Sequence, residues 1–265
     1  MNRFFLPENS LPAAPAIGAD VTLAAEDAAH IARVLRLGPG ERVVLVVAPE
    51  REALAELVSV DSKAVRARIV ATRSVRCEAP LRIRLAQGVA KGEKMDYIVQ
   101  KSTELGVAEF IPVLTERSVV RLDRERGEER ARRWQKIARE AAQQSGRTVV
   151  PAVLPPLPFA AALPCAVAGS DLHLIPYEGE SGRGLHETLS AASVGAGGTI
   201  TVYIGPEGGF ADNEVAAAMA AGCLPVSLGP RILRTETAGP AALTMIMYHL
   251  GDLGRAAGAP GPWEE

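Results

Sequence analysis

Residues 200–210 read ITVYIGPEGGF, and residues 224–238 read LPVSLGPRILRTETA. Each stretch begins as an apolar strand and breaks at a Gly-Pro pair, which starts at Gly205 in the first and at Gly229 in the second. The Ala-rich segment between them predicts a short helix. Two Gly-Pro breaks after two successive buried strands place two loops on the same edge of a sheet. In open α/β sheets that edge is where ligands bind.

The chemistry of both loops favours a binding site. The glycines between residues 205 and 209 have no side chains, so backbone N–H groups can approach a ligand and positive φ angles are accessible. Glu207 is the only ionisable residue of that loop. The second loop carries Arg234, Glu236 and two threonines beside a predicted helix N-terminus. The first loop alone would be interpreted as a glycine-rich structural turn. The charged and hydroxyl side chains of the second loop make a binding site the favoured interpretation of the two loops together.

Two common nucleotide motifs do not match this region. Residues 205–210 do not follow G-x-G-x-x-G, and they lie near the end of the chain rather than in a first βα turn. They do not follow G-x-x-x-x-G-K-[ST] either, because no lysine follows. The sequence therefore disfavours a dinucleotide dehydrogenase and a P-loop phosphotransferase.

Length and composition limit the class of protein. The 265 residues suit two domains of ordinary size. Hydrophobic residues make up 48% of the chain, and the formal net charge is −2, so positive charge for nucleic acid must be concentrated on one face. Three cysteines without a C-x-x-C pair favour a reducing cytoplasm and argue against a zinc site, and we expect no metal. No apolar run is long enough to cross a bilayer, so we expect no membrane partner.

The pattern along the chain predicts an α/β protein with two domains. Residues 1–72 contain short β-branched runs and one helix between residues 20 and 38, which indicates a small β-barrel. Residues 73–80 end in proline and form the predicted linker. Residues 81–254 open with a strand, a helix and a strand, so we expect a parallel sheet. Residues 255–265 are rich in Gly and Pro and form a predicted flexible tail.

Positive charge is concentrated between Arg117 and Arg147. Ten basic residues oppose five acidic residues in this window, a net charge of +5. Trp134 and its apolar neighbours form the buried stripe of a predicted helix over residues 128–144. The basic residues lie mainly off that stripe, so the helix is either solvated and held by i,i+4 ion pairs or a surface for RNA phosphates. The proline-rich residues 151–164 are expected to be a surface connection.

Several motifs together carry a family resemblance. Residues 204–210 and 228–238 form one pair of motifs, and residues 91–106 read KGEKMDYIVQKSTELG. Near the N-terminus, Arg3–Phe5 and residues 30–36 add two more. In this order and spacing they resemble the ribosomal RNA small subunit methyltransferase E family of the SPOUT superfamily. The resemblance covers both predicted domains.

The resemblance implies a fold and an activity. SPOUT enzymes contain a parallel-sheet domain tied in a trefoil knot, which sequence patterns alone would not predict. The N-terminal barrel corresponds to a PUA-like RNA-binding domain. The implied activity is S-adenosylmethionine-dependent methylation of the N3 position of a uridine in the 16S ribosomal RNA of the small ribosomal subunit. The family also implies a cytoplasmic homodimer.

The resemblance assigns a set of residues to S-adenosylmethionine. In the family the knot loops hold this cofactor in a bent shape, and the apolar pair Ile232 and Leu233 suits one wall of an adenine site. The implied cofactor-binding residues are Leu174, Tyr177, Glu178, Gly205, Pro206, Glu207, Gly208, Gly209, Leu228, Gly229, Ile232, Leu233, Thr235, Thr237 and Ala238.

Two residues of the second loop are candidates for catalysis. A uracil N3–H group is a poor nucleophile, so a base or a stabilising cation is needed. Arg234 could stabilise the uracil anion, and Glu236 could accept a proton or hold the cofactor. A structural ion pair between the two is an equally plausible use of both side chains. The candidate RNA-contacting residues are Arg3, Arg33, Arg36, Lys91, Lys94, Lys101, Arg117, Arg133 and Arg147.

Two other functions stay open. A non-catalytic RNA-binding or ribosome-assembly factor would keep the arginine cluster but would not need two intact glycine-bearing loops. A SPOUT methyltransferase that acts on another RNA, such as transfer RNA, would keep both loops. The N-terminal motifs argue against this second alternative.

Overall fold

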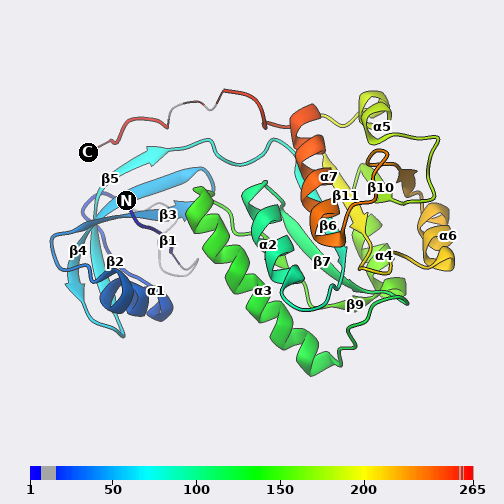
Figure 1. The fold of residues 1–265 in the computed structure, drawn as a ribbon. Coiled ribbons are helices and arrows are strands. Elements are labelled where there is room, and N and C mark those ends of the chain that lie inside the picture. The colour runs from blue at the N-terminus through cyan, green and yellow to red at the C-terminus, as the bar shows by residue number, and fades with distance from the viewer. Residues whose placement is uncertain (7–15, 257, 259, 265) are drawn as a thin grey trace. The chain divides into compact units, whose positions relative to one another are not determined.

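The structure is a computed structural model that describes residues 1–6, 16–256, 258 and 260–264. Its contacts divide the chain into two units, which are described separately below (Figure 1). The first unit comprises residues 1–78, 143–149 and 256–265, and the second comprises residues 79–142 and 150–255.

These units differ from the boundaries expected from the sequence. The strand β5 runs from Val65 to Ser74, so the first residues of the expected 73–80 linker belong to a strand. Near the other end of the chain, Glu264 exchanges backbone hydrogen bonds of 2.8 and 3.0 Å with Thr72. The first unit accordingly includes the described residues of the expected 255–265 tail from Ala256 onward, and Arg255 belongs to the second unit. Three residues of that tail lie outside the described part of the chain: Ala257, Ala259 and Glu265.

The first unit is a five-stranded sheet with one helical segment. Its strands are β1 (Arg3–Phe5), β2 (Asp20–Thr22), β3 (Arg42–Ala48), β4 (Arg51–Val60) and β5 (Val65–Ser74), in the order β1-β3-β4-β5-β2. β1 and β3 are parallel, and the other pairs are antiparallel, with β4 and β5 joined as a hairpin. The helix α1 (Ala25–Ala29) continues into the π-helix η2 (His30–Leu35). Alternate residues of β3, β4 and β5 pack with Ile31 in one core.

The second unit is built on a seven-stranded sheet. Its strands are β6 (Arg82–Gly88), β7 (Glu109–Leu114), β8 (Ala152–Val153), β9 (Leu157–Pro158), β10 (Leu172–Pro176), β11 (Thr199–Ile204) and β12 (Leu224–Val226). The order is β12-β10-β11-β6-β7-β8, with β9 also beside β7, and every pair is parallel. The expected parallel α/β sheet is confirmed, and the trefoil knot stays a prediction.

Helices cover both faces of this sheet, as parallel strands require (Figure 1). Apolar residues on one face of the sheet pack with α2 (Lys94–Glu104), α3 (Arg124–Ser145), α5 (Leu185–Ala191) and α7 (Thr235–His249). The other face packs with α4 (Phe159–Val167) and α6 (Asp212–Ala220). Residues 151–164, expected to be a connection, instead contain β8, β9 and the start of α4.

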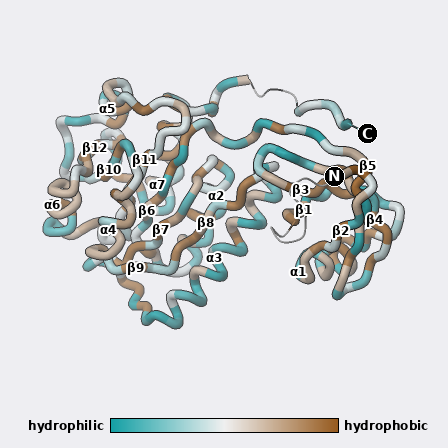
Figure 2. The backbone as a smooth tube through the Cα atoms, turned by 180° about the vertical axis from the view of Figure 1, so that it is seen from behind, coloured by the Kyte–Doolittle hydropathy of each residue, from teal (hydrophilic) through white to brown (hydrophobic). Residues whose placement is uncertain are grey.

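The basic helix α3 has one buried side. Trp134 is 1% exposed and packs in the core with Ala138. In Figure 2 the tube of α3 alternates between teal and brown, as expected for a helix with a single apolar stripe. Within the described residues, no helix is both long and apolar enough to span a bilayer.

Candidate functional site

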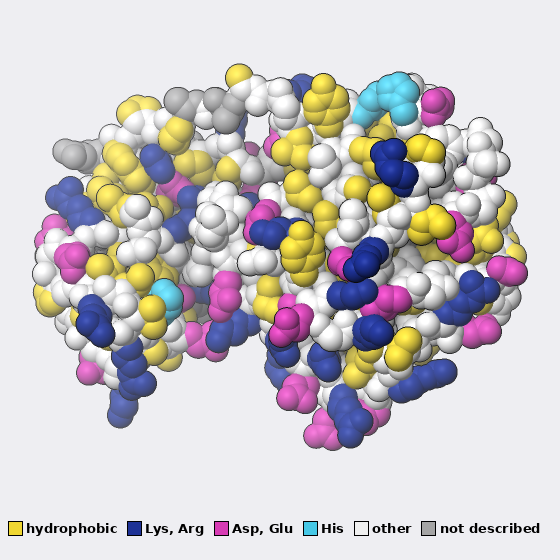
Figure 3. All heavy atoms as spheres, viewed as in Figure 1, with side chains coloured by type: hydrophobic (Ala, Val, Ile, Leu, Met, Phe, Trp, Pro, Cys, Tyr) yellow, Lys and Arg dark blue, Asp and Glu magenta, His cyan; other side chains and the backbone are white. Residues whose placement is uncertain are grey.

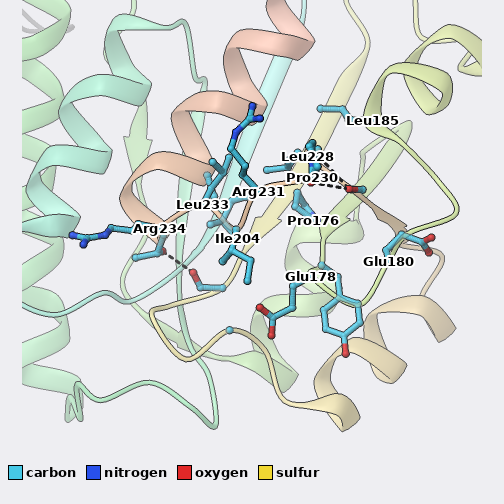
Figure 4. Close-up of a pocket in the computed structure, with 18 of the residues that line it drawn as sticks. Pro176, Glu178, Glu180, Leu185, Ile204, Leu228, Pro230, Arg231, Leu233 and Arg234 are labelled. Atoms are coloured by element: carbon cyan, nitrogen blue, oxygen red, sulfur yellow. Dashed lines mark hydrogen bonds between the residues drawn. The ribbon is translucent and has the colours of Figure 1, made fainter.

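A cavity of about 1170 Å³ lies where the strands β10, β11 and β12 end (Figure 4). Because β12, β10 and β11 are parallel neighbours, the loops that follow them meet at one edge of the sheet. Residues of all three loops line the cavity, together with Lys94 of α2 and Ala238 and Met245 of α7. The structure therefore brings together the two glycine-bearing loops and the loop after β10, which contains the predicted residues Tyr177 and Glu178.

Most of the residues predicted to bind the cofactor line this cavity. They are Tyr177, Glu178, Gly205, Pro206, Glu207, Gly209, Leu228, Gly229, Ile232, Leu233, Thr235 and Ala238. Leu174 is fully buried in β10 and belongs to the core of the second unit. Gly208, Thr237 and Glu236 are not among the lining residues, although each is next to one in the chain.

The first glycine loop is packed so tightly that side chains would not fit at several positions. A Cβ atom on Gly205 would lie 3.0 Å from the backbone of Gly209, which itself has a φ of +68°. A Cβ atom on Gly208 would lie 3.1 Å from the Cβ of Arg117. On the neighbouring strand, a Cβ atom on Gly88 would lie 2.5 Å from the ring and backbone nitrogen of Pro206. Glycine is therefore required by close packing at Gly88, a position that the sequence analysis did not single out.

A buried chain of hydrogen bonds fixes the start of this loop. The side-chain amide of Gln87, at the end of β6, donates to the hydroxyl of Thr235 at 3.0 Å. That hydroxyl donates to the carbonyl of Gly205 at 2.6 Å. Gln87 is fully buried and Thr235 is 6% exposed, so water does not compete for these groups. The first residue of α7 is thereby joined to the first glycine loop.

Replacing Thr235 with valine is expected to weaken cofactor binding about fivefold, because the carbonyl of Gly205 and the amide of Gln87 lose their partner in a buried place. Titration of the purified variant with S-adenosylmethionine measures this. Thr244→Val is the matched control, since its hydroxyl donates within the same helix to the carbonyl of Pro240 and is exposed. Equal affinities for the two variants would contradict the role of the Thr235 hydroxyl.

The second loop offers an apolar surface and free backbone donors. Ile232 is 85% exposed in the wall of the cavity. Among the described residues, the backbone N–H groups of Leu228, Ile232 and Leu233 have no hydrogen-bond acceptor. Gly229 has a φ of +119°, which other residues rarely adopt. An apolar side chain beside unpaired N–H groups suits a flat heteroaromatic ring with polar edges.

Charged groups at the cavity edge are paired in a way that the sequence analysis did not foresee. The ammonium of Lys94 lies 3.3 Å from Glu207 and 3.2 Å from Glu236. The pKa of Glu236 is lowered, first by its own backbone N–H at the start of α7 and then by Lys94. Arg234 forms no ion pair or hydrogen bond through its guanidinium within the described residues, and Figure 4 shows it on the opposite side of the cavity from Glu180. No Arg234–Glu236 ion pair is formed in this part of the chain.

Apart from Lys94, which pairs with Glu207 and Glu236, the predicted RNA-contacting residues fall into three environments. Arg33 and Arg36 in the first unit and Lys91 in the second are exposed. Lys101, Arg117 and Arg133 are partly or largely exposed and pair with Glu104, Asp212 and Asp96, respectively. Arg3 and Arg147 are instead mostly buried and paired with Glu52 and Glu78. These last two pairs hold the first unit together, which leaves their cations little freedom to meet phosphates.

Basic side chains on the surface are mixed with acidic ones. Figure 3 shows dark blue and magenta side chains interspersed in the region of α3. Local pairs such as Arg124–Glu128, at 3.0 Å, account for part of this pattern. No group of three or more potential metal-ligating side chains comes together in the described residues.

Comparison with known proteins defines the class. The sequence profile described as an RNA methyltransferase domain matches residues 77–247, and the one described as an RNA methyltransferase PUA domain matches residues 23–70. The parallel sheet, its edge cavity and these two matches define an RNA methyltransferase with a PUA domain.

Named relatives and solved structures specify the family. Ribosomal RNA small subunit methyltransferase E of Bacillus subtilis is 35% identical over 252 residues, which cover 94% of this chain and 96% of that protein. A methyltransferase of Legionella pneumophila, solved with bound S-adenosylmethionine, has a TM-score of 0.84 and 35% identity over 95% of this chain and 98% of its own. The Neisseria gonorrhoeae methyltransferase E, also solved with that cofactor, has a TM-score of 0.81 and 33% identity over 96% and 99%. The present chain belongs to the ribosomal RNA small subunit methyltransferase E family.

Proposed function

We propose that this protein transfers the methyl group of S-adenosylmethionine to the N3 position of a uridine in the 16S ribosomal RNA of the small ribosomal subunit. Family membership supports the reaction class and the kind of RNA. The observation that carries the proposal is the edge cavity, because its 1170 Å³ exceed the roughly 300–1,000 Å³ of ordinary small-molecule sites. This volume leaves space for a nucleoside cofactor and for a base beside it.

The residues of the cavity fit this cofactor. The close-packed glycines of the first loop expose backbone where a nucleoside can lie, and Ile232 offers its apolar face to an adenine ring. The unpaired N–H groups of Leu228 and Leu233 suit polar atoms of the adenine edge. Glu178 lines the cavity with no ion-pair or hydrogen-bond partner for its carboxylate in the described residues, which suits a hydroxyl or ammonium group of the ligand. S-adenosylmethionine supplies an activated methyl group, so the leaving group needs no help from the protein.

Arg234 is our candidate for stabilising the reacting base. Loss of the N3 proton makes the uracil ring anionic, and a cation placed near that charge lowers the barrier. Arg234 is exposed at the edge of the cavity and has no carboxylate partner within the described residues. Its guanidinium is therefore available to a base that enters from solvent. The base must first be unstacked, which is easiest in a single-stranded or junction region of RNA.

An RNA substrate also requires contacts to phosphates outside the cavity. The exposed Arg33 and Arg36 in the first unit, and Lys91 in the second, suit phosphate contacts. We also propose that the protein forms a homodimer and contains a trefoil knot, as the family resemblance implies. Action on ribosomal RNA would place the protein in the cytoplasm, where small subunits are assembled.

Analysis of the methylated nucleoside tests this proposal. Purified protein is incubated with labelled S-adenosylmethionine and, in parallel, with small ribosomal subunits, naked 16S RNA or transfer RNA. Digestion and mass spectrometry are expected to give 3-methyluridine from small-subunit RNA. Labelling of transfer RNA alone would favour another substrate, and no transfer by folded protein on any RNA would favour a non-catalytic assembly factor.

A further inference from the structure

One lysine connects the two glycine-bearing loops. Lys94 is the first residue of α2, Glu207 lies in the loop after β11, and Glu236 is the second residue of α7. The Lys94 ammonium is 3.3 Å from Oε1 of Glu207 and 3.2 Å from Oε2 of Glu236. The backbone N–H of Lys91 donates to the same Oε1 of Glu207 at 3.2 Å. Three elements distant in sequence therefore meet at a single cation.

Removing this cation would leave an unfavourable arrangement. Glu207, in the first glycine loop, and Glu236, at the start of α7, would face each other as two like charges. The Oε2 atom of Glu236 is buried and has no hydrogen-bond partner in the described part of the chain, so Lys94 is its charge partner. A buried carboxylate oxygen without a partner is costly, and the loops would move apart to hydrate it.

The same geometry bears on the fate of the N3 proton. Glu236 sits at the N-terminus of α7, where its own backbone N–H and then Lys94 lower the pKa of its carboxyl group. The charge of Arg234, the residue just before α7, also lowers the pKa of Glu236. A general base works best when its pKa is near the working pH, so a carboxylate with a lowered pKa is a weak base. Glu236 also does not line the cavity.

We propose that Lys94 is a positioning residue that fastens the two glycine-bearing loops to each other, and that Glu236 is its anchor rather than the acceptor of the N3 proton. The proposal rests on the proposed function and deepens it. The Lys94 cation holds the first glycine loop at a fixed position relative to the start of α7, next to the buried Thr235–Gly205 hydrogen bond. The proton of uracil N3 then leaves to solvent while Arg234 stabilises the ring anion.

Titration with S-adenosylmethionine tests the role of Lys94 without any RNA. Lys94→Met is expected to weaken binding about tenfold, and Lys94→Arg to recover most of the affinity, because a guanidinium keeps the charge. Lys63→Met is the control, since Lys63 is exposed in a turn of the first unit. Combining Lys94→Met with Glu236→Gln is expected to cost less than the sum of the two single losses. Wild-type affinity in Lys94→Met, or additive losses, would overturn the proposal.

Steady-state kinetics with the methylated RNA substrate test the role of Glu236. Glu236→Gln is expected to raise KM for S-adenosylmethionine, leave kcat within about threefold of wild type and keep the shape of its pH profile. A fall of kcat by about 10²–10⁴-fold together with loss of the acidic limb would identify Glu236 as the base and overturn this assignment. Absence of methyl transfer by the wild type would count against the proposed function instead, and the binding experiment would still decide the role of Lys94.

Discussion

Gly88→Ala is expected to weaken the binding of S-adenosylmethionine about 100-fold, a larger effect than any side-chain truncation at the rim of the cavity. Its Cβ atom would lie 2.5 Å from Cδ and from the backbone nitrogen of Pro206 and 3.0 Å from the carbonyl carbon of Gly205. Real Cβ atoms essentially never come so close to backbone, and no side-chain rotation relieves the contact. The first glycine loop must therefore move away from β6, and the part of the cavity wall that it forms moves with it.

Calorimetric titration measures this loss, and a melting curve establishes that the variant is folded. Gly195→Ala is the matched control, because a Cβ atom there meets nothing within 4 Å and the backbone does not have a positive φ. We expect the control to bind like the wild type. A Gly88→Ala protein that binds the cofactor normally would show that the first loop does not form the site.

Arg234→Ala is expected to lower kcat of methyl transfer about 10²–10³-fold while leaving the affinity for S-adenosylmethionine within a few-fold of wild type. The physical reason is that its unpaired guanidinium would act only on charge that develops on the uracil ring. Arg234→Lys should restore part of the rate, since the charge is kept but the planar donor pair is lost.

Single-turnover kinetics with the cofactor and RNA at saturation give this value directly. Arg82→Ala serves as the control, because Arg82 is 57% exposed at the amino end of β6, the edge of the sheet opposite the cavity. If Arg234→Ala reduced only the apparent affinity for RNA, Arg234 would be a phosphate contact and another cation would have to stabilise the base.

Much of the fold could be predicted from local patterns. The Gly-Pro breaks at Gly205 and Gly229 correctly predicted two loops at one sheet edge, because parallel neighbouring strands end on the same side. The prediction that the proline-rich residues 151–164 form a surface connection was wrong, because α4 begins at Phe159 and contains Pro164 in its last turn. Proline indicates a break by local sterics, and here packing of the helix against the sheet outweighs that preference.

The parts of the site that the sequence did not reveal depend on contacts between distant elements. Lys94 was expected to contact RNA, and the structure places it between two carboxylates 113 and 142 positions further along the chain. Gln87 and Gly88 end β6, whose last six residues are buried, and a polar residue followed by glycine at the end of this strand was the available signal for a buried contact. Their partners, Thr235 and Pro206, become adjacent only when the sheet is assembled.

A crystal structure of the protein with S-adenosylmethionine tests the proposed cofactor site. We expect one cofactor molecule in the cavity, with its base against Ile232 and its polar edges near the N–H groups of Leu228 and Leu233. We also expect Lys94 to bridge Glu207 and Glu236 in that complex. Cofactor density elsewhere on the chain, or none at a concentration that saturates binding in solution, would contradict the proposed site.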